Sequence, residues 1–81
     1  MRVNVCIPVL SSAYEFDIDE KKQISALIEE IVETVCQQEH IIQKGGTAQM
    51  LMLHKENKCI LQSYQDPVRA GIRNGDTLII I

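Results

Sequence analysis

Two histidines and two adjacent serines are the first residues to consider for metal binding or catalysis. His40 and His54 have no cysteine, histidine or carboxylate at metal-ligand spacing except the neighbouring Glu39, so we predict two surface side chains. Ser11 and Ser12 have no histidine placed to activate them as nucleophiles. Neither pair predicts a reactive centre.

The three cysteines, Cys6, Cys36 and Cys59, are odd in number and lack the CxxC spacing of zinc and redox sites. This pattern is typical of reduced, partly buried thiols in a cytosolic protein. Cys36 lies toward the C-terminal end of a predicted helix, where the helix dipole opposes thiolate formation. We therefore predict a structural role for it.

The glycine pair Gly45-Gly46 is not followed by the lysine and the serine or threonine of a P-loop, so it predicts no phosphate site. Asp17 and Asp19 alternate with apolar residues, as the solvent-facing side of a strand does. The sequence thus predicts no catalytic residue, no cofactor and no metal, and we expect that the chain is not an enzyme.

Size and charge limit the remaining classes of function. The 81 residues, 46% of them apolar and 23% charged, suffice for one globular domain spanning residues 1–81. A net charge of −3 and scattered basic residues argue against nucleic acid as a partner. No signal-peptide pattern opens the chain, and no apolar run approaches a membrane span. We expect a cytoplasmic protein that meets a membrane only through a partner.

Two alternating apolar patterns open the chain and predict a β-hairpin. The first covers residues 2–10, with Pro8 marking either the strand end or a sheet edge. The second covers residues 13–19. The side chains predicted to face the core are Val3, Val5, Ile7, Val9, Tyr14, Phe16 and Ile18.

A helical period then replaces the alternation, from about residues 21–24 to residue 38. Its apolar stripe consists of Ile24, Leu27, Ile28, Ile31, Val32 and Val35. The glycine pair at 45–46 ends this region, and three short strands are predicted near residues 50–53, 59–61 and 77–81. The predicted order is ββαβββ.

One amphipathic helix can cover only one face of a sheet. Placing the first and last strands side by side and parallel, with the helix across them, buries the longest apolar faces together. We therefore predict an α+β domain, a β-grasp with a mixed sheet packed on one helix.

The ending AGIRNGDTLIII, residues 70–81, resembles ubiquitin and its relatives, and the resemblance extends over nearly the whole chain. It implies a ubiquitin-like β-grasp in which Ile72 enters the core before a polar turn at residues 73–76. Asn74-Gly75 suits such a turn because both residues tolerate positive φ.

Within that superfamily, the chain is most similar to the YukD/EsaB family of bacterial ubiquitin-like proteins of type VII (ESAT-6-like) secretion systems. The stretches that carry this resemblance are EFDID, HKENK and GIRNGDTLIII. The central segment HIIQKGGTAQ departs from the family pattern.

Ubiquitin and the sulfur carriers react through a C-terminal Gly-Gly tail, whereas this chain stops at Ile81. The resemblance therefore implies a non-conjugating accessory or regulatory protein that binds a protein component of a secretion machine. Alternatives are a carrier truncated before its Gly-Gly tail, a ubiquitin-like domain excised from a membrane subunit of the machine, and a generic β-grasp interaction module.

Surplus apolar residues in the third and fifth strands predict the binding surface. Both strands are apolar on both faces, although the helix covers only one face. If Leu51 and Leu53 point into the core together with Leu78 and Ile80, one exposed protein-binding patch remains, made of Met50, Met52, Ile79 and Ile81. In ubiquitin the same sheet face carries the main recognition patch. A loop over residues 40–48 or a homodimer could instead cover the patch.

Overall fold

A computed structural model describes residues 1–43 and 45–81 of the chain. The strands are β1 (Arg2–Ile7), β2 (Ser12–Asp17), β3 (Met52–His54), β4 (Cys59–Ile60) and β5 (Thr77–Ile80). A 3-10 turn, η1 (Pro8–Leu10), joins β1 to β2, and the helix α1 (Ile24–Gln38) follows the hairpin. The predicted order ββαβββ is confirmed. Within the described ranges, no helix combines the length and the apolar character that a membrane crossing needs.

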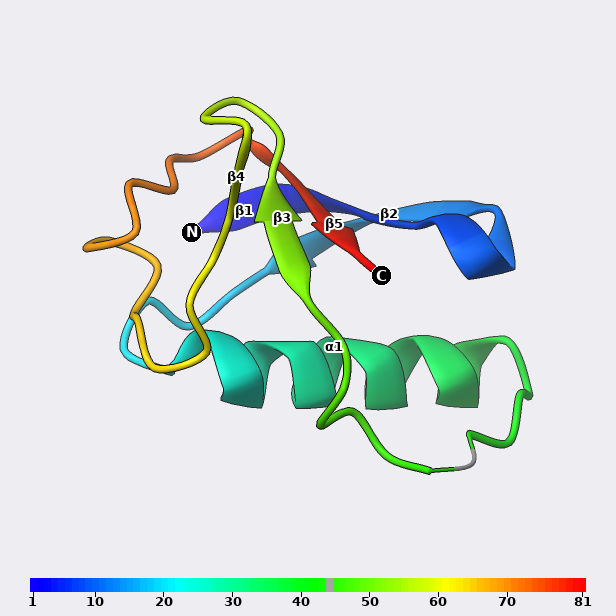
Figure 1. Cartoon of the computed structure of the whole chain (residues 1–81). Coiled ribbons are helices and arrows are strands. Elements are labelled where there is room, and N and C mark those ends of the chain that lie inside the picture. The colour runs from blue at the N-terminus through cyan, green and yellow to red at the C-terminus, as the bar shows by residue number, and fades with distance from the viewer. Residues whose placement is uncertain (44) are drawn as a thin grey trace.

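The five strands form one mixed sheet in the order β2-β1-β5-β3-β4. β1 pairs antiparallel with β2 and parallel with β5, so the first and last strands lie side by side inside the sheet, as predicted. α1 runs across one face of this sheet (Figure 1). This is the predicted β-grasp arrangement.

α1 forms where the apolar period changes from two residues to 3.6. All six residues of the predicted stripe are buried, and the polar side chains of the helix face away from the sheet. Gln23 precedes the helix without a side-chain cap, and the N–H groups of Ile24 and Ser25 donate instead to the carbonyls of Gln65 and Ser63 in the segment after β4. The helix is thus held by the packing of its apolar stripe and, at its first turn, by these two backbone hydrogen bonds.

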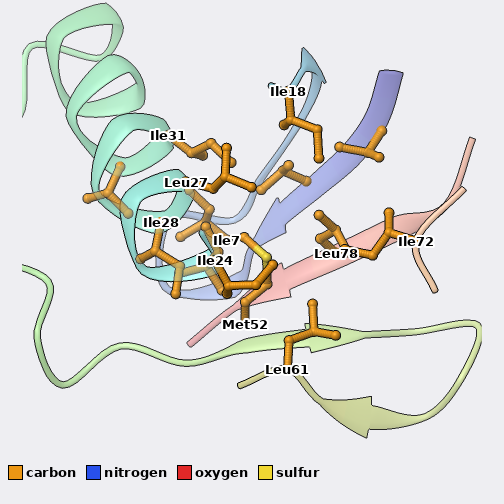
Figure 2. Packing of buried hydrophobic residues seen from close by; sticks show 14 of the residues in the cluster. Ile7, Ile18, Ile24, Leu27, Ile28, Ile31, Met52, Leu61, Ile72 and Leu78 are labelled. Carbon is orange, nitrogen blue, oxygen red and sulfur yellow. The ribbon is translucent and has the colours of Figure 1, made fainter. Parts of the chain in front are cut away.

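The core lies between α1 and the sheet and is almost entirely aliphatic. Figure 2 shows Leu27, Ile28 and Ile31 of α1 pointing toward Leu78 of β5 and Met52 of β3. The segments after β4 close the edge of this core through Leu61 and Ile72, which are also buried. Burial of Ile72 confirms its predicted position.

The end of the first strand differs from the prediction. β1 stops at Ile7, and Val9, predicted to face the core, is 87% exposed. Pro8 has no N–H for the ladder, and it begins the turn η1 instead. Ser11 closes that turn in the left-handed conformation, with φ of 51°, and its N–H donates to the Pro8 carbonyl.

The third strand has the opposite orientation to the one predicted. Met52, expected to point outward, is 0% exposed, whereas Leu53, expected in the core, faces outward and is half-buried. Met50, also expected outside, packs against the margin of the core. The pairing of Met52 with the buried Ile80 of β5 sets this register, and a shift of one residue exchanges the two faces of a strand.

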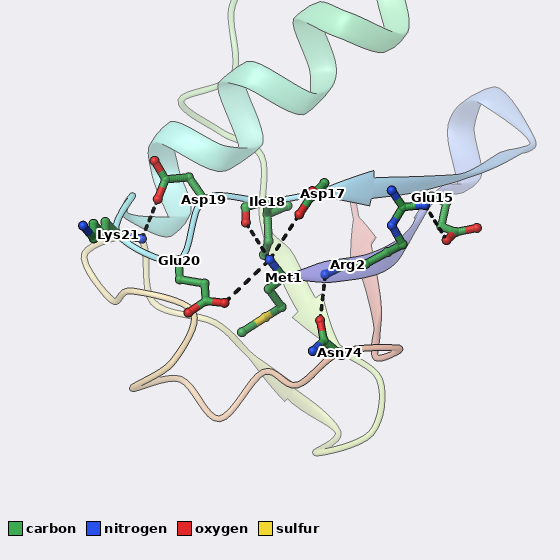
Figure 3. A network of polar contacts seen from close by, with 9 residues as sticks. All are labelled: Met1, Arg2, Glu15, Asp17, Ile18, Asp19, Glu20, Lys21 and Asn74. Atoms are coloured by element: carbon green, nitrogen blue, oxygen red, sulfur yellow. Dashed lines mark hydrogen bonds and ion pairs between the residues drawn. The ribbon is translucent and has the colours of Figure 1, made fainter.

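The polar turn before β5 lies against the start of β1. Gly75 has a φ of 87°, as the turn prediction requires, and its N–H donates to the Arg2 carbonyl. Asn74 Oδ1 accepts the Arg2 N–H at 2.8 Å (Figure 3). In the same region, the Met1 ammonium lies 3.1 Å from Asp17 Oδ1, which joins the first residue to the end of β2.

The register of β3 predicts unequal costs of truncating two neighbouring residues. Met52→Ala is expected to lower the free energy of unfolding by about 2–5 kcal/mol, because it opens a cavity in the core. Leu53→Ala is expected to cost under about 1.5 kcal/mol, because the lost side chain is only half-buried. Urea unfolding of both variants measures the difference. A larger loss for Leu53→Ala would contradict the register.

Candidate functional site

The uncovered face of the sheet carries one apolar row that crosses all five strands. Cys6 of β1 lies opposite Ala13 of β2 and opposite Ile79 of β5. Leu53 of β3 in turn lies opposite Ile79 and opposite Ile60 of β4. We call this set the outer apolar row; its members are Ala13, Cys6, Ile79, Leu53 and Ile60.

The outer apolar row faces away from α1, because the core residues of each strand occupy the alternating positions. Its members range from half-buried to exposed, and Ile60, at the edge, is 53% exposed. α1 lies on the opposite face of the sheet (Figure 1). The described chain therefore presents an apolar strip on the face of the sheet opposite α1.

Polar residues border this strip on one side. Asn4 lies opposite Glu15 on one neighbouring strand and opposite Thr77 on the other, and the Lys55 N–H donates to the Thr77 carbonyl. An apolar centre with a polar rim is the usual composition of a protein-binding surface. Ile79 lies at the middle of the strip, flanked by Cys6 and Leu53.

The apolar surface continues on the other side of the row through Leu51 and Ile81. Their backbones exchange two hydrogen bonds of 2.9 and 3.0 Å, so the two residues extend the pairing of β3 with β5 by one step. Both side chains are exposed.

The structure separates the four residues of the predicted patch. Ile79 is a member of the outer apolar row, and Ile81 lies beside that row. Met52 is in the core and Met50 at its margin, so both methionines were assigned to the wrong surface. The apolar surface on the outer face of the sheet instead includes Leu51, Leu53 and Ile60. Met52 and His54 are two positions apart and both buried, so they lie on the inward face of β3, and Leu53 between them lies on the outer face.

The position of His54 was also predicted wrongly. Its side chain is 1% exposed and not on the surface, while His40 is exposed as predicted. His54 Nε2 lies 2.7 Å from Asp76 Oδ2 and 3.7 Å from Glu56 Oε1. Both carboxylates also accept backbone N–H groups, Asp76 from Arg73 and Glu56 from Thr77. The three side chains thus join the end of β3 to the turn before β5.

One imidazole nitrogen and two carboxylates lie close enough to suggest a cation site, since their ligand atoms are within 4.8 Å of one another. The 2.7 Å between Nε2 and Asp76 Oδ2 is, however, a hydrogen-bond distance, whereas two ligands of one tetrahedral zinc ion lie about 3.3 Å apart. Among the described residues, His54 Nδ1 is buried without a partner, although a ligating histidine normally donates from its second nitrogen. The geometry therefore favours a structural hydrogen bond between His54 and Asp76 over a metal site.

Within residues 1–43 and 45–81, the other reactive residue types do not assemble into a site. Cys6 and Cys36 are half-buried and Cys59 is exposed, and all three are free thiols. The Ser12 hydroxyl donates to the Leu10 carbonyl within the hairpin turn. Gly45 and Gly46 are exposed with positive φ.

Asp76 makes stability depend on pH. Burial alone raises the pKa of this carboxyl, but the N–H of Arg73 and the ring of His54 outweigh it, so the pKa lies below its ordinary value of 3.8. A lowered folded-state pKa adds stability above pH 3.8 that is lost as the pH falls through the folded-state value.

Asp76→Asn is therefore expected to lower the free energy of unfolding at pH 7 by about 1–2 kcal/mol. The variant is also expected to lose less stability than the unmodified chain between pH 4 and pH 2. Urea unfolding at these pH values tests this, with the exposed Glu15→Gln as the control, expected to change stability by under about 0.5 kcal/mol. Parallel pH profiles for Asp76→Asn and the unmodified chain would contradict the prediction.

Neither a protein-family model nor a curated protein matches this sequence. Solved structures do match it. The solution NMR structure of the ubiquitin-like domain of an Arabidopsis thaliana protein has a TM-score of 0.72 and 16% identity, over 100% of this chain and 74% of that chain. A computationally designed protein based on human erythrocytic ubiquitin has a TM-score of 0.73 and 16% identity, over 99% of this chain and 87% of that chain. The fold is that of ubiquitin.

Proposed function

We propose that this chain is a non-enzymatic ubiquitin-like module that binds a protein partner through the outer apolar row. The observation that carries the proposal is the continuity of that row, with one apolar residue on each of the five strands. Exposed apolar patches bordered by polar residues are typical of protein interaction sites.

The proposed partner is a protein component of a type VII (ESAT-6-like) secretion machine, and the chain acts on it in the cytoplasm as an accessory or regulatory protein. The stretches EFDID, HKENK and GIRNGDTLIII support this assignment through their resemblance to the YukD/EsaB family. The first begins in β2 and extends two residues beyond it, the second runs from the last residue of β3 through the turn to β4, and the third includes β5. None of them interrupts the outer apolar row.

Capture from an extract of the native cell, with the purified chain immobilised, tests this proposal. We expect mass spectrometry to identify a secretion-machine component. Ile60→Asp is expected to reduce its recovery roughly tenfold or more, because a charge then enters an apolar interface. The matched control is Val68→Asp, since Val68 is 57% exposed in the segment between β4 and β5, is not a member of the outer apolar row, and resembles Ile60, which is 53% exposed.

Thermal unfolding of both variants must first show that they remain folded. Recovery of no secretion component would refute the assigned partner. Equal recovery with Ile60→Asp and with the unmodified chain would refute the assigned surface, whatever the partner is.

A further inference from the structure

The edge strand β2 pairs with only one other strand in the described chain. It lies beside β1 over six consecutive positions without a bulge, whereas β4, at the opposite edge of the sheet, has two residues. β2 also contains no proline. A long and regular edge without these blocking devices is a template for the addition of a further strand.

Backbone hydrogen bonds show which residues of β2 face that edge. The N–H of Ile18, one residue past β2, donates to the Met1 carbonyl. Because the pairing in an antiparallel ladder alternates, the N–H and carbonyl groups of residues 12, 14 and 16 point toward β1, and those of Ala13, Glu15 and Asp17 point toward solvent. In residues 1–43 and 45–81, no hydrogen bond reaches these three outward backbones. We call the three residues the β2 edge.

The outer face of the β2 edge is acidic. Glu15 and Asp17 are exposed there, and Ala13 also belongs to the outer apolar row. Figure 3 shows that the cations paired with the two carboxylates, Arg2 and the Met1 ammonium, come from β1 and the residue before it. A strand added on the other side of β2 places its own side chains next to both carboxylates.

The helix-facing side of β2 is aromatic. Tyr14 and Phe16 are half-buried against the core and pack edge to face, with their ring centroids 6.2 Å apart. The Tyr14 hydroxyl donates to Glu39 Oε1 at the end of α1, which holds this ring in place. Aromatic side chains pair well with β-branched side chains on a neighbouring strand. The two faces of β2 therefore favour an added strand that is basic on one face and apolar on the other.

A second copy of this chain is a poor occupant of the β2 edge. A two-fold symmetric pair of β2 strands is antiparallel, and the register that pairs all three outward residues sets Glu15 opposite the second copy's Glu15. A shift in one direction sets Glu15 opposite Asp17, and a shift in the other leaves only two outward residues paired. Like charges directly opposite each other are destabilising, whereas cations on an added strand attract both carboxylates.

We propose that the β2 edge binds an extended segment of another protein as a sixth strand, in which lysine or arginine alternates with valine or isoleucine. The backbone of this segment pairs with Ala13, Glu15 and Asp17. Its cations lie beside the two carboxylates, and its apolar side chains lie beside the rings of Tyr14 and Phe16. The site goes beyond the proposed function, because strand addition uses the backbone at the edge of the sheet and not its apolar face, although Ala13 belongs to both.

NMR of the isotope-labelled chain with the capped hexapeptide Lys-Val-Lys-Ile-Lys-Val tests the proposal. In the free chain, the N–H groups of the β2 edge are expected to exchange with solvent faster than those of Tyr14 and Phe16, which are bonded to β1. Saturating peptide is expected to slow the exchange of all three edge N–H groups roughly fivefold or more. The control peptide Lys-Lys-Lys-Val-Ile-Val has the same composition without the alternation, and is expected to bind roughly fivefold more weakly.

Two comparisons of variants separate the backbone contact from the charge. Glu15→Pro removes an outward N–H that takes no part in the ladder with β1, and is expected to raise the dissociation constant roughly tenfold over Glu15→Gln, which removes the same charge. Glu15→Gln/Asp17→Asn is expected to weaken binding roughly fivefold, as two exposed ion pairs are lost. Its matched control is Glu29→Gln/Glu33→Gln, an equal change of charge on exposed residues of α1, expected to keep the affinity. Thermal unfolding shows that each variant remains folded.

The proposal is overturned by absence of binding, by unchanged exchange at the β2 edge, by equal affinity for the two peptides, or by equal weakening from the two double variants. Equal affinity of Glu15→Pro and Glu15→Gln also overturns it. Protection of the β2 edge that grows with protein concentration in the absence of peptide would identify a second copy as the occupant instead. Ile60→Asp is expected to leave the affinity for the peptide unchanged, and a roughly tenfold loss would assign the peptide to the outer apolar row. The two binding surfaces are thus tested separately.

Discussion

The parallel pairing of β1 with β5 is the contact on which the rest of the structure depends. It places Val5 beside Leu78 inside the sheet, and α1 covers that junction. β2 and β3 then pair with the free sides of these two strands, so one pairing determines where every other strand lies. It also fixes the orientation of Ile79, since burial of Leu78 and Ile80 forces the residue between them to the opposite face.

The periodicity of apolar residues was enough to predict those helices and strands that have one apolar and one polar face. The stripe of α1 and the alternation in β1 have one apolar side each, and the structure buries that side. β3 gives no such signal, because Leu51, Met52 and Leu53 are all apolar and either face could be buried. Its pairing with β5 decides which face is buried, and the choice of the wrong face removed Leu53 from the predicted patch. His54 was placed on the surface for a different reason, the absence of metal ligands at suitable spacing in the sequence.

The same ambiguity explains what could be predicted of the candidate site. Ile79 was found because its two neighbours in β5 were expected in the core. Cys6 and Ile60 were missed because a cross-strand row joins residues that are remote in sequence, and no local pattern connects them.

The contact between Asn74 and Arg2 joins residues 72 positions apart in the sequence. During synthesis on a ribosome, β1 emerges long before β5, its parallel neighbour in the finished sheet. Until β5 has emerged, the apolar faces of the N-terminal hairpin and α1 are only partly covered, and β1 keeps one unpaired edge. Closing so long a loop is a slow, non-local step, and the domain completes its core only when β5 inserts between β1 and β3.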